Sequence, residues 1–204
     1  MAASQSLPPG ARPDSDAPPP TARRLARATA ELVEFGVPCH FLHCNRDFLL
    51  GEDYAAAARL RLLPESLVVP LYGTPTLLLH GDTLCTDDVE YQAFRKQARD
   101  PAWQAAILKL PVEQRLRMAR EARDASSQHI GSTAMDIMDV NGTAVEEAFL
   151  DHGVTHMIHG HTHRPAVHRH QLEQGIDAQR IVLADWYSAG SYLEVTPDGA
   201  RSVT

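Results

Sequence analysis

Cysteine is scarce in this sequence, with only Cys39, Cys44 and Cys85 among 204 residues. None of them forms a C-x-x-C pair, and an odd number this small does not make a disulfide framework. Chains without disulfides are typical of reducing compartments, so the sequence predicts a cytoplasmic protein.

Long apolar runs are also lacking. No segment approaches the roughly 20 consecutive apolar residues that a membrane-spanning helix needs. The first residues contain no apolar core of the kind found in signal peptides, so we expect no cleaved export signal. Any membrane contact is therefore expected to be peripheral.

A surplus of basic charge is absent as well. The chain has 19 Lys and Arg against 26 Asp and Glu, a formal charge of −7. Proteins that bind nucleic acid usually carry a positive surplus, so no nucleic-acid partner is expected. The composition is otherwise that of a soluble globular domain, with 44% apolar and 22% charged residues.

The first 21 residues are rich in proline and poor in apolar side chains, which predicts a disordered tail over 1–21. A helix is expected over 22–35, with Leu25, Thr29, Leu32 and Val33 as its buried stripe. Further strands are expected at 37–43, 66–71, 76–80, 154–159, 180–184 and 191–195, and helices near 53–61 and across most of 86–150. The short turn over Tyr72–Pro75 predicts that the strands at 66–71 and 76–80 form a hairpin. This alternation predicts an α/β sheet protein.

Polar side chains of the kind that bind metals follow three of these strands. They are Asn45-Arg46-Asp47, His80-Gly81-Asp82 and His159-Gly160-His161-Thr162-His163. Side chains at the carboxyl ends of neighbouring strands can converge on one crevice, and Asn oxygen and His nitrogen suit ions such as Mn²⁺ or Zn²⁺. Each motif alone also fits a polar turn or a hydrogen-bonded core histidine. The ordered set of three favours a metal centre.

Longer runs around these motifs resemble a known family. GVPCHFLHCNRDFLLG at 36–51, LLLHGDTLCTDD at 77–88 and MIHGHTHRPAVH at 157–168 resemble three motifs of the calcineurin-like metallophosphoesterases. NRDFLLG, HGDTLCTDDVEYQAFR, IMDVN and HGHTHRPAVH resemble one branch of that family, the UDP-2,3-diacylglucosamine diphosphatases of lipid A synthesis. The resemblance covers about residues 24–196.

The resemblance implies a fold and a reaction. The fold would be a sheet sandwich with flanking helices over 22–204 and a helical cap insertion at about 89–140, which fits an acyl-chain cover. The reaction would be hydrolysis of the pyrophosphate bond of UDP-2,3-diacylglucosamine to UMP and 2,3-diacylglucosamine 1-phosphate. The family uses two Mn²⁺ ions for this.

Residue by residue, the resemblance also implies a site. Asn45, His80 and His161 match ligands of one manganese ion, and His163 matches a ligand of the other. Asn45, Arg46 and His161 match catalytic positions, with Arg46 expected on a phosphate oxygen. The positions that match substrate contacts are Arg46, Asp88, Tyr91, Ser126 and His161. His159 is expected to have a structural role.

The sequence also departs from the family pattern. The family begins with a strand carrying Asp-x-His and a second strand ending in Gly-Asp, and neither motif stands before Asn45-Arg46-Asp47 in this sequence. We therefore expect a truncated phosphoesterase domain with exposed apolar sheet surface and fewer than two bound Mn²⁺ ions. Cys44 stands where the family usually has glycine, and it would strain the loop if that position had a positive φ.

Four functions remain open from the sequence. They are an active diphosphatase, a catalytically inactive fragment of that enzyme, a metallophosphoesterase of other specificity, and a histidine-rich metal-binding module. Arg117, Arg120 and Arg123 share one helical face in the cap. This face is either simply solvated or attracted to anionic lipid on the cytoplasmic side of the inner membrane.

Overall fold

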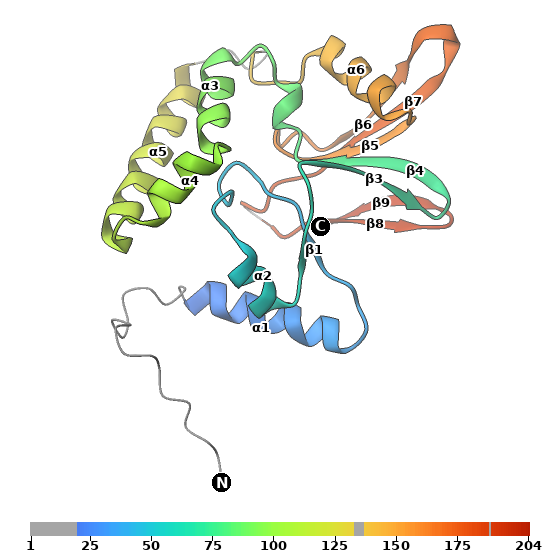
Figure 1. The fold of residues 1–204 in the computed structure, drawn as a ribbon. Coiled ribbons are helices and arrows are strands. Elements are labelled where there is room, and N and C mark those ends of the chain that lie inside the picture. Colours follow the sequence, from blue (N-terminus) through green and yellow to red (C-terminus); the bar gives the residue numbers. More distant parts are fainter. Residues whose placement is uncertain (1–19, 133–136, 188) are drawn as a thin grey trace.

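A computed structural model describes residues 20–132, 137–187 and 189–204 of the chain. Its centre is a five-stranded sheet with the order β3-β4-β5-β7-β6 (Figure 1). The strands are β3 (Ser66–Leu71), β4 (Thr74–Leu79), β5 (His156–His159), β6 (Ala166–Gln171) and β7 (Asp177–Val182). β4, β5 and β7 are parallel, and the edge strands β3 and β6 are antiparallel to their neighbours. The predicted α/β class is confirmed.

The predicted hairpin forms β3 and β4, which pair from Ser66 opposite Leu79 to Leu71 opposite Thr74. Its turn needs two residues in the left-handed region, and Tyr72 (φ 48°) and Gly73 (φ 88°) occupy it. Strand β3 alternates exposed and half-buried positions, as expected of an edge strand with one covered face.

One face of the sheet carries the core. Alternate residues of β4 and β5, including Leu77, Leu79 and Met157, point to this face because side chains alternate along a strand. Helix α6 (Gly142–His152) packs Val145 and Phe149 against them, and all five side chains are buried. Asn141 begins α6 by accepting a hydrogen bond from the Ala144 amide, and Gly153 (φ 61°) ends it. Figure 1 shows α6 lying over this face.

The opposite face is covered less completely. The hairpin of β8 (Tyr192–Thr196) and β9 (Gly199–Val203) lies on this side, and a pocket of about 180 Å³ separates it from the sheet (Figure 1). Leu78 and Ile158 are only half-buried there, and Val167 is 58% exposed. Part of the apolar surface on this face is therefore accessible to solvent.

The prediction for the buried face of the first helix differs from the structure. Helix α1 (Pro20–Glu34) forms where expected, but its predicted buried stripe is wrong, because Leu25 is 59% and Leu32 is 49% exposed. The face that contacts α2 (Glu52–Ala58) instead buries Ala26. A seven-residue helix rich in alanine is too small a partner to cover the long side chains.

Two strand predictions also differ from the structure. The strand expected at 37–43 shrinks to β1 (His40–Phe41), because its partner β2 (Arg61–Leu62) offers only two residues for pairing. The strands expected at 180–184 and 191–195 exist as β7 and β8 but lie in different sheets. Each pairs with a strand that the sequence did not reveal, β6 and β9, which are polar and exposed.

Three helices occupy the range expected for the cap: α3 (Val89–Ala98), α4 (Pro101–Leu108) and α5 (Val112–Ser132). They stand beside the sheet at the end where β4 leads into α3 (Figure 1). Most of the predicted tail, residues 1–19, and residues 133–136 of the cap range lie outside the described residues. In the described parts of the chain, no helix combines the length and the apolarity needed to cross a membrane.

Candidate active site

The fold brings two of the predicted metal ligands together. β4 and β5 are parallel neighbours, and His80 follows the end of β4 while His161 follows the end of β5. His80 Nε2 lies 3.1 Å from His161 Nδ1. Their rings meet edge to face, with centroids 4.9 Å apart. The carboxyl ends of β4 and β5 thus bring two imidazoles together, as the strand pattern predicted.

A carboxylate and a phenol complete the immediate surroundings of this pair. The ring of Tyr91, on α3, lies 5.1 Å from the ring of His161. The Tyr91 hydroxyl donates to Asp82 Oδ2 at 3.2 Å, and Arg95 Nε donates to the same oxygen at 2.8 Å. Tyr91 and Arg95 are four residues apart on α3, so one helix face holds the Asp82 carboxylate from two directions.

The electrostatics of the site favour neutral imidazoles. Burial, followed by repulsion from His161, lowers the pKa of His80 to about 4. Burial also lowers the pKa of His161. Burial alone would raise the pKa of Asp82, but His80 and Arg95 outweigh it, so the pKa lies below its ordinary value. Near pH 7 the site therefore presents imidazole lone pairs beside an ionised carboxylate.

His159 is buried behind this pair. Arg180 Nη1 donates to its Nε2 at 2.9 Å, because a guanidinium can only donate. Its Nδ1–H then donates to the Gly160 carbonyl at 2.9 Å. Burial lowers the pKa of His159 to about 4. With both nitrogens used, His159 supports the strand end, which is consistent with the structural role expected for it.

The motif Asn45-Arg46-Asp47 forms a tight loop. The Cys44 amide donates to Asp47 Oδ1 at 2.6 Å, and Asn45 Oδ1 accepts from the Cys44 thiol at 2.9 Å. Arg46 is exposed. Arg99, the residue that follows α3, donates to the Cys44 carbonyl at 3.2 Å, which joins this loop to the cap helices. The φ of Cys44 is not positive, so the strain expected from cysteine there does not arise.

The other predicted site residues spread outward from the histidine pair. His163 is exposed, with a left-handed backbone (φ 54°), and its ring lies 5.5 Å from the ring of Tyr187. Asp88 is buried and caps α3 by accepting from the Tyr91 amide at 3.0 Å, which fixes the helix that carries Tyr91. Ser126 is exposed on α5.

The donor set can be tested against the expected metal. Zinc–imidazole bonds are about 2.0–2.1 Å long, so two nitrogens 3.1 Å apart can reach one borderline divalent ion. The same distance also suits a hydrogen bond between neutral imidazoles. Among the described residues, no three His, Cys, Asp or Glu side chains are grouped as metal ligands. Within the part of the chain that the structure describes, His80 and His161 are the paired donors that could hold one such ion.

Two residues near the site were not predicted from the sequence. Arg95 holds Asp82 and also pairs with Glu65 at 2.8 Å, just before β3. Arg180 reaches His159 from β7, 21 residues away in the sequence. The four-residue spacing from Tyr91 could have indicated Arg95. No sequence pattern indicates Arg180, because only the pairing of β7 with β5 brings it to His159.

Comparisons with known proteins show which family the chain belongs to. No protein-family model matches the chain. The UDP-2,3-diacylglucosamine hydrolase of Yersinia pseudotuberculosis serotype O:1b is 49% identical over 189 residues, which cover 93% of this chain and 78% of that protein. The UDP-2,3-diacylglucosamine hydrolase of Yersinia pestis bv. Antiqua has the same identity and coverage. Identity at this level over most of both chains means that this chain belongs to the UDP-2,3-diacylglucosamine hydrolase family.

Proposed function

We propose that this chain hydrolyses the pyrophosphate bond of UDP-2,3-diacylglucosamine and releases UMP and 2,3-diacylglucosamine 1-phosphate. The observation that carries the proposal is the His80–His161 pair at the end of two parallel strands, in a chain 49% identical to hydrolases of that name. In this function the lipid-linked nucleotide is the substrate and manganese is the cofactor.

The chain's own residues have distinct roles in this proposal. His80, His161 and Asn45 would hold Mn²⁺, which when bound activates water and stabilises phosphoryl charge. Arg46, exposed beside Asn45, would meet a phosphate oxygen through a charge-assisted hydrogen bond. Tyr91 and Arg95 keep Asp82 fixed and ionised beside the imidazoles. Burial and Asp82 raise the Tyr91 pKa, so its hydroxyl stays protonated as a donor.

The test is UMP release from UDP-2,3-diacylglucosamine by the purified 204-residue protein equilibrated with Mn²⁺, with metal content measured on the same sample. We expect turnover above a protein-free control and loss of bound manganese in His80→Ala and His161→Ala. Removal of a ligand should lower the rate about 100-fold or more, since even outer partners of a metal site cost 10–100-fold.

The matched control is His152→Ala, a histidine at the end of α6 that contacts Ala148 and Ser66 instead of the site. It should keep both manganese and turnover. An absence of UMP release from correctly folded wild-type protein with bound manganese would refute the proposal.

The second candidate is a catalytically inactive relative of the enzyme. It is favoured by the lack of a three-ligand His, Cys, Asp or Glu group in the described parts of the chain. Manganese binding that depends on His80 and His161, with no UMP release, would establish this alternative.

We further propose that α5 meets an anionic membrane surface. Arg117, Arg120 and Arg123 lie along α5 with exposed side chains, and Leu116 beside them is 51% exposed. Basic side chains near an anionic leaflet each add attraction. Sedimentation with phosphatidylglycerol vesicles should fall for Arg117→Glu/Arg120→Glu, and neutral phosphatidylcholine vesicles should bind neither protein. Equal sedimentation of wild-type and variant protein would contradict this contact.

A further inference from the structure

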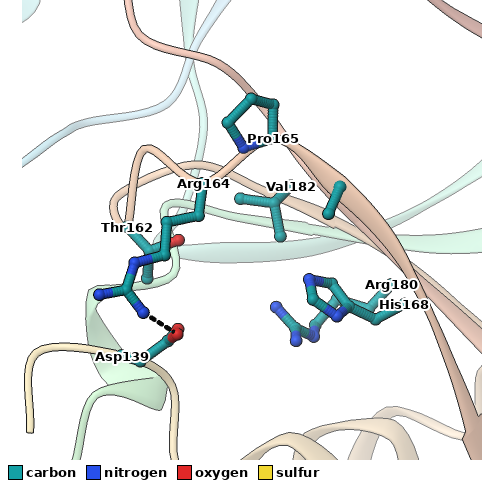
Figure 2. A pocket seen from close by; sticks show the side chains of 8 residues that line it. Asp139, Thr162, Arg164, Pro165, His168, Arg180 and Val182 are labelled. Carbon is teal, nitrogen blue, oxygen red and sulfur yellow. Dashed lines mark hydrogen bonds and ion pairs between the residues drawn. The ribbon is translucent and has the colours of Figure 1, made fainter. Parts of the chain in front are cut away.

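A pocket of about 190 Å³ lies on the α6 side of the sheet, behind the loop that carries His161 and His163. Strands β6 and β7, the loop after β5 and the segment before α6 contribute its walls (Figure 2). Its lining includes Asp139, Thr162, Arg164, His168 and Arg180, and we call it the Arg180 pocket. None of the residues assigned above to metal or substrate lines it.

Arg180 is the unusual group of this pocket. Arg180 is only 6% exposed, although arginine is among the residues least often buried. Its hydrogen bonds go to two imidazoles, His159 at 2.9 Å and His170 at 3.4 Å. Within the described parts of the chain no carboxylate forms an ion pair with it. Since arginine does not lose its proton in proteins, β7 buries a cation without a direct counter-charge.

The other charged groups of the pocket do not neutralise it. Asp139 is the single carboxylate among the lining residues, and it forms an ion pair with Arg164. His168 is the register partner of Arg180 on β6, so both side chains point to the same face of the sheet. Figure 2 shows the guanidinium beside the His168 ring and directed toward the side where Asp139 and Arg164 lie. Asp139 also attracts Arg180 electrostatically, so among the described lining residues one carboxylate is shared by two arginines.

We propose that the Arg180 pocket binds a small oxyanion of the phosphate type, which supplies the missing counter-charge. Guanidinium groups are suited to such anions because their N–H donors match two oxygens at once. The pocket is smaller than the about 300–1,000 Å³ of sites for drug-sized ligands, so it suits a free ion better than a nucleotide. Thr162 is part of its wall, so the anion steadies the loop between His161 and His163 from behind.

The test uses metal-free protein, so that it does not depend on the proposed hydrolysis. Inorganic phosphate is titrated into the whole chain at constant ionic strength, with chloride as the reference, and the Tm is measured. We expect a saturable rise of about 2–4 °C with phosphate at several times its dissociation constant. Isothermal calorimetry should show one site per chain.

Two variants locate the effect. Arg180→Gln should abolish the phosphate-dependent rise, and His168→Glu should abolish it with Arg180 still present, by placing a negative charge in the pocket. Arg169→Gln is the matched control, because Arg169 neighbours His168 but is exposed on the other side of β6. Arg46→Gln should also keep the response, since Arg46 lies at the proposed substrate site.

UMP is tested in parallel, because its phosphate has the same chemistry. UMP should cause no increase in Tm that His168→Glu removes. A phosphate response equal to that of chloride, or one that survives in both pocket variants, would overturn the proposal. If UMP raised the Tm more than phosphate does, and His168→Glu removed this increase, the assignment of a small free oxyanion would be overturned.

Discussion

At the scale of single residues, one contact controls the approach of β4 to β5. Gly81 has φ 105°, and a Cβ placed on it would lie 2.5 Å from His159 Nδ1 and 3.3 Å from the Gly160 carbonyl. His159 cannot move away freely, because Arg180 and Gly160 hold both of its nitrogens. The absence of a side chain at Gly81 therefore lets His80 and His161 meet.

Substitution of Gly81 should be costly for two separable reasons. Gly81→Ala is expected to lower the free energy of unfolding by about 3 kcal/mol, from the positive φ and from the clash with His159. Gly73→Ala is the control: its φ is 88°, but no atom lies within 4 Å of the added Cβ. It should lose about 1 kcal/mol through the backbone alone. Urea unfolding measures both, and equal losses would contradict the role of the His159 contact.

At the scale of secondary-structure elements, α3 connects the cap helices to the sheet. Its Arg95 bridges Asp82, after β4, and Glu65, before β3. Gln92 adds hydrogen bonds to the Asp82 and Cys85 carbonyls at 2.7 and 3.0 Å. Arg99 pairs with Glu65 at 3.4 Å and holds the Cys44 loop. One face of one helix thus ties together two of the three predicted ligand motifs.

Loss of Arg95 should therefore destabilise the protein through Asp82. Arg95→Met leaves a carboxylate whose side chain is 4% exposed without its cation, and we expect a loss of about 3 kcal/mol, typical of a broken buried pair. Arg27→Met is the control, since its pair with Glu31 is exposed and should contribute less than about 1 kcal/mol. Thermal unfolding distinguishes the two. Similar small losses would mean that the Asp82–Arg95 pair is effectively solvated.

At the scale of the whole molecule, buried neutral histidines make stability depend on pH. The pKa values of His80 and His159 are lowered to about 4 in the folded chain, while unfolded histidine titrates near 6.5. Between these values the unfolded state binds more protons than the folded state, so acid favours unfolding. The contribution is present in full above about pH 6.5 and is lost as the pH falls toward 4.

The expected result is a fall in the urea midpoint between pH 7.0 and pH 4.5. His159→Gln should unfold at lower urea at pH 7.0 but show a smaller fall, because one of the histidines with a lowered pKa is gone. A midpoint that stays constant or rises on acidification would contradict the assigned pKa shifts.

Much of the architecture follows from local sequence patterns. The short strands and the turn over Tyr72–Pro75 predicted the β3–β4 hairpin, and the polar motifs after apolar strands predicted that His80 and His161 lie close together. Both inferences work because strand periodicity and turn chemistry are properties of a few adjacent residues. The resemblance of the motifs to one family added the expected chemistry, and the relatives confirm that membership.

The tertiary structure decided what depends on contacts between distant segments. No local sequence signal indicates the exposure of Leu25 and Leu32 or the separation of β7 and β8 into two sheets. The same holds for the Arg95–Glu65 and His159–Arg180 contacts. Helical periodicity shows that a stripe can be buried, but only the size of the opposing surface decides whether it is. The sequence by itself determined the ligand motifs and the elements with a clear apolar pattern, and the packing determined the polar strands β6 and β9 and which charges the elements enclose.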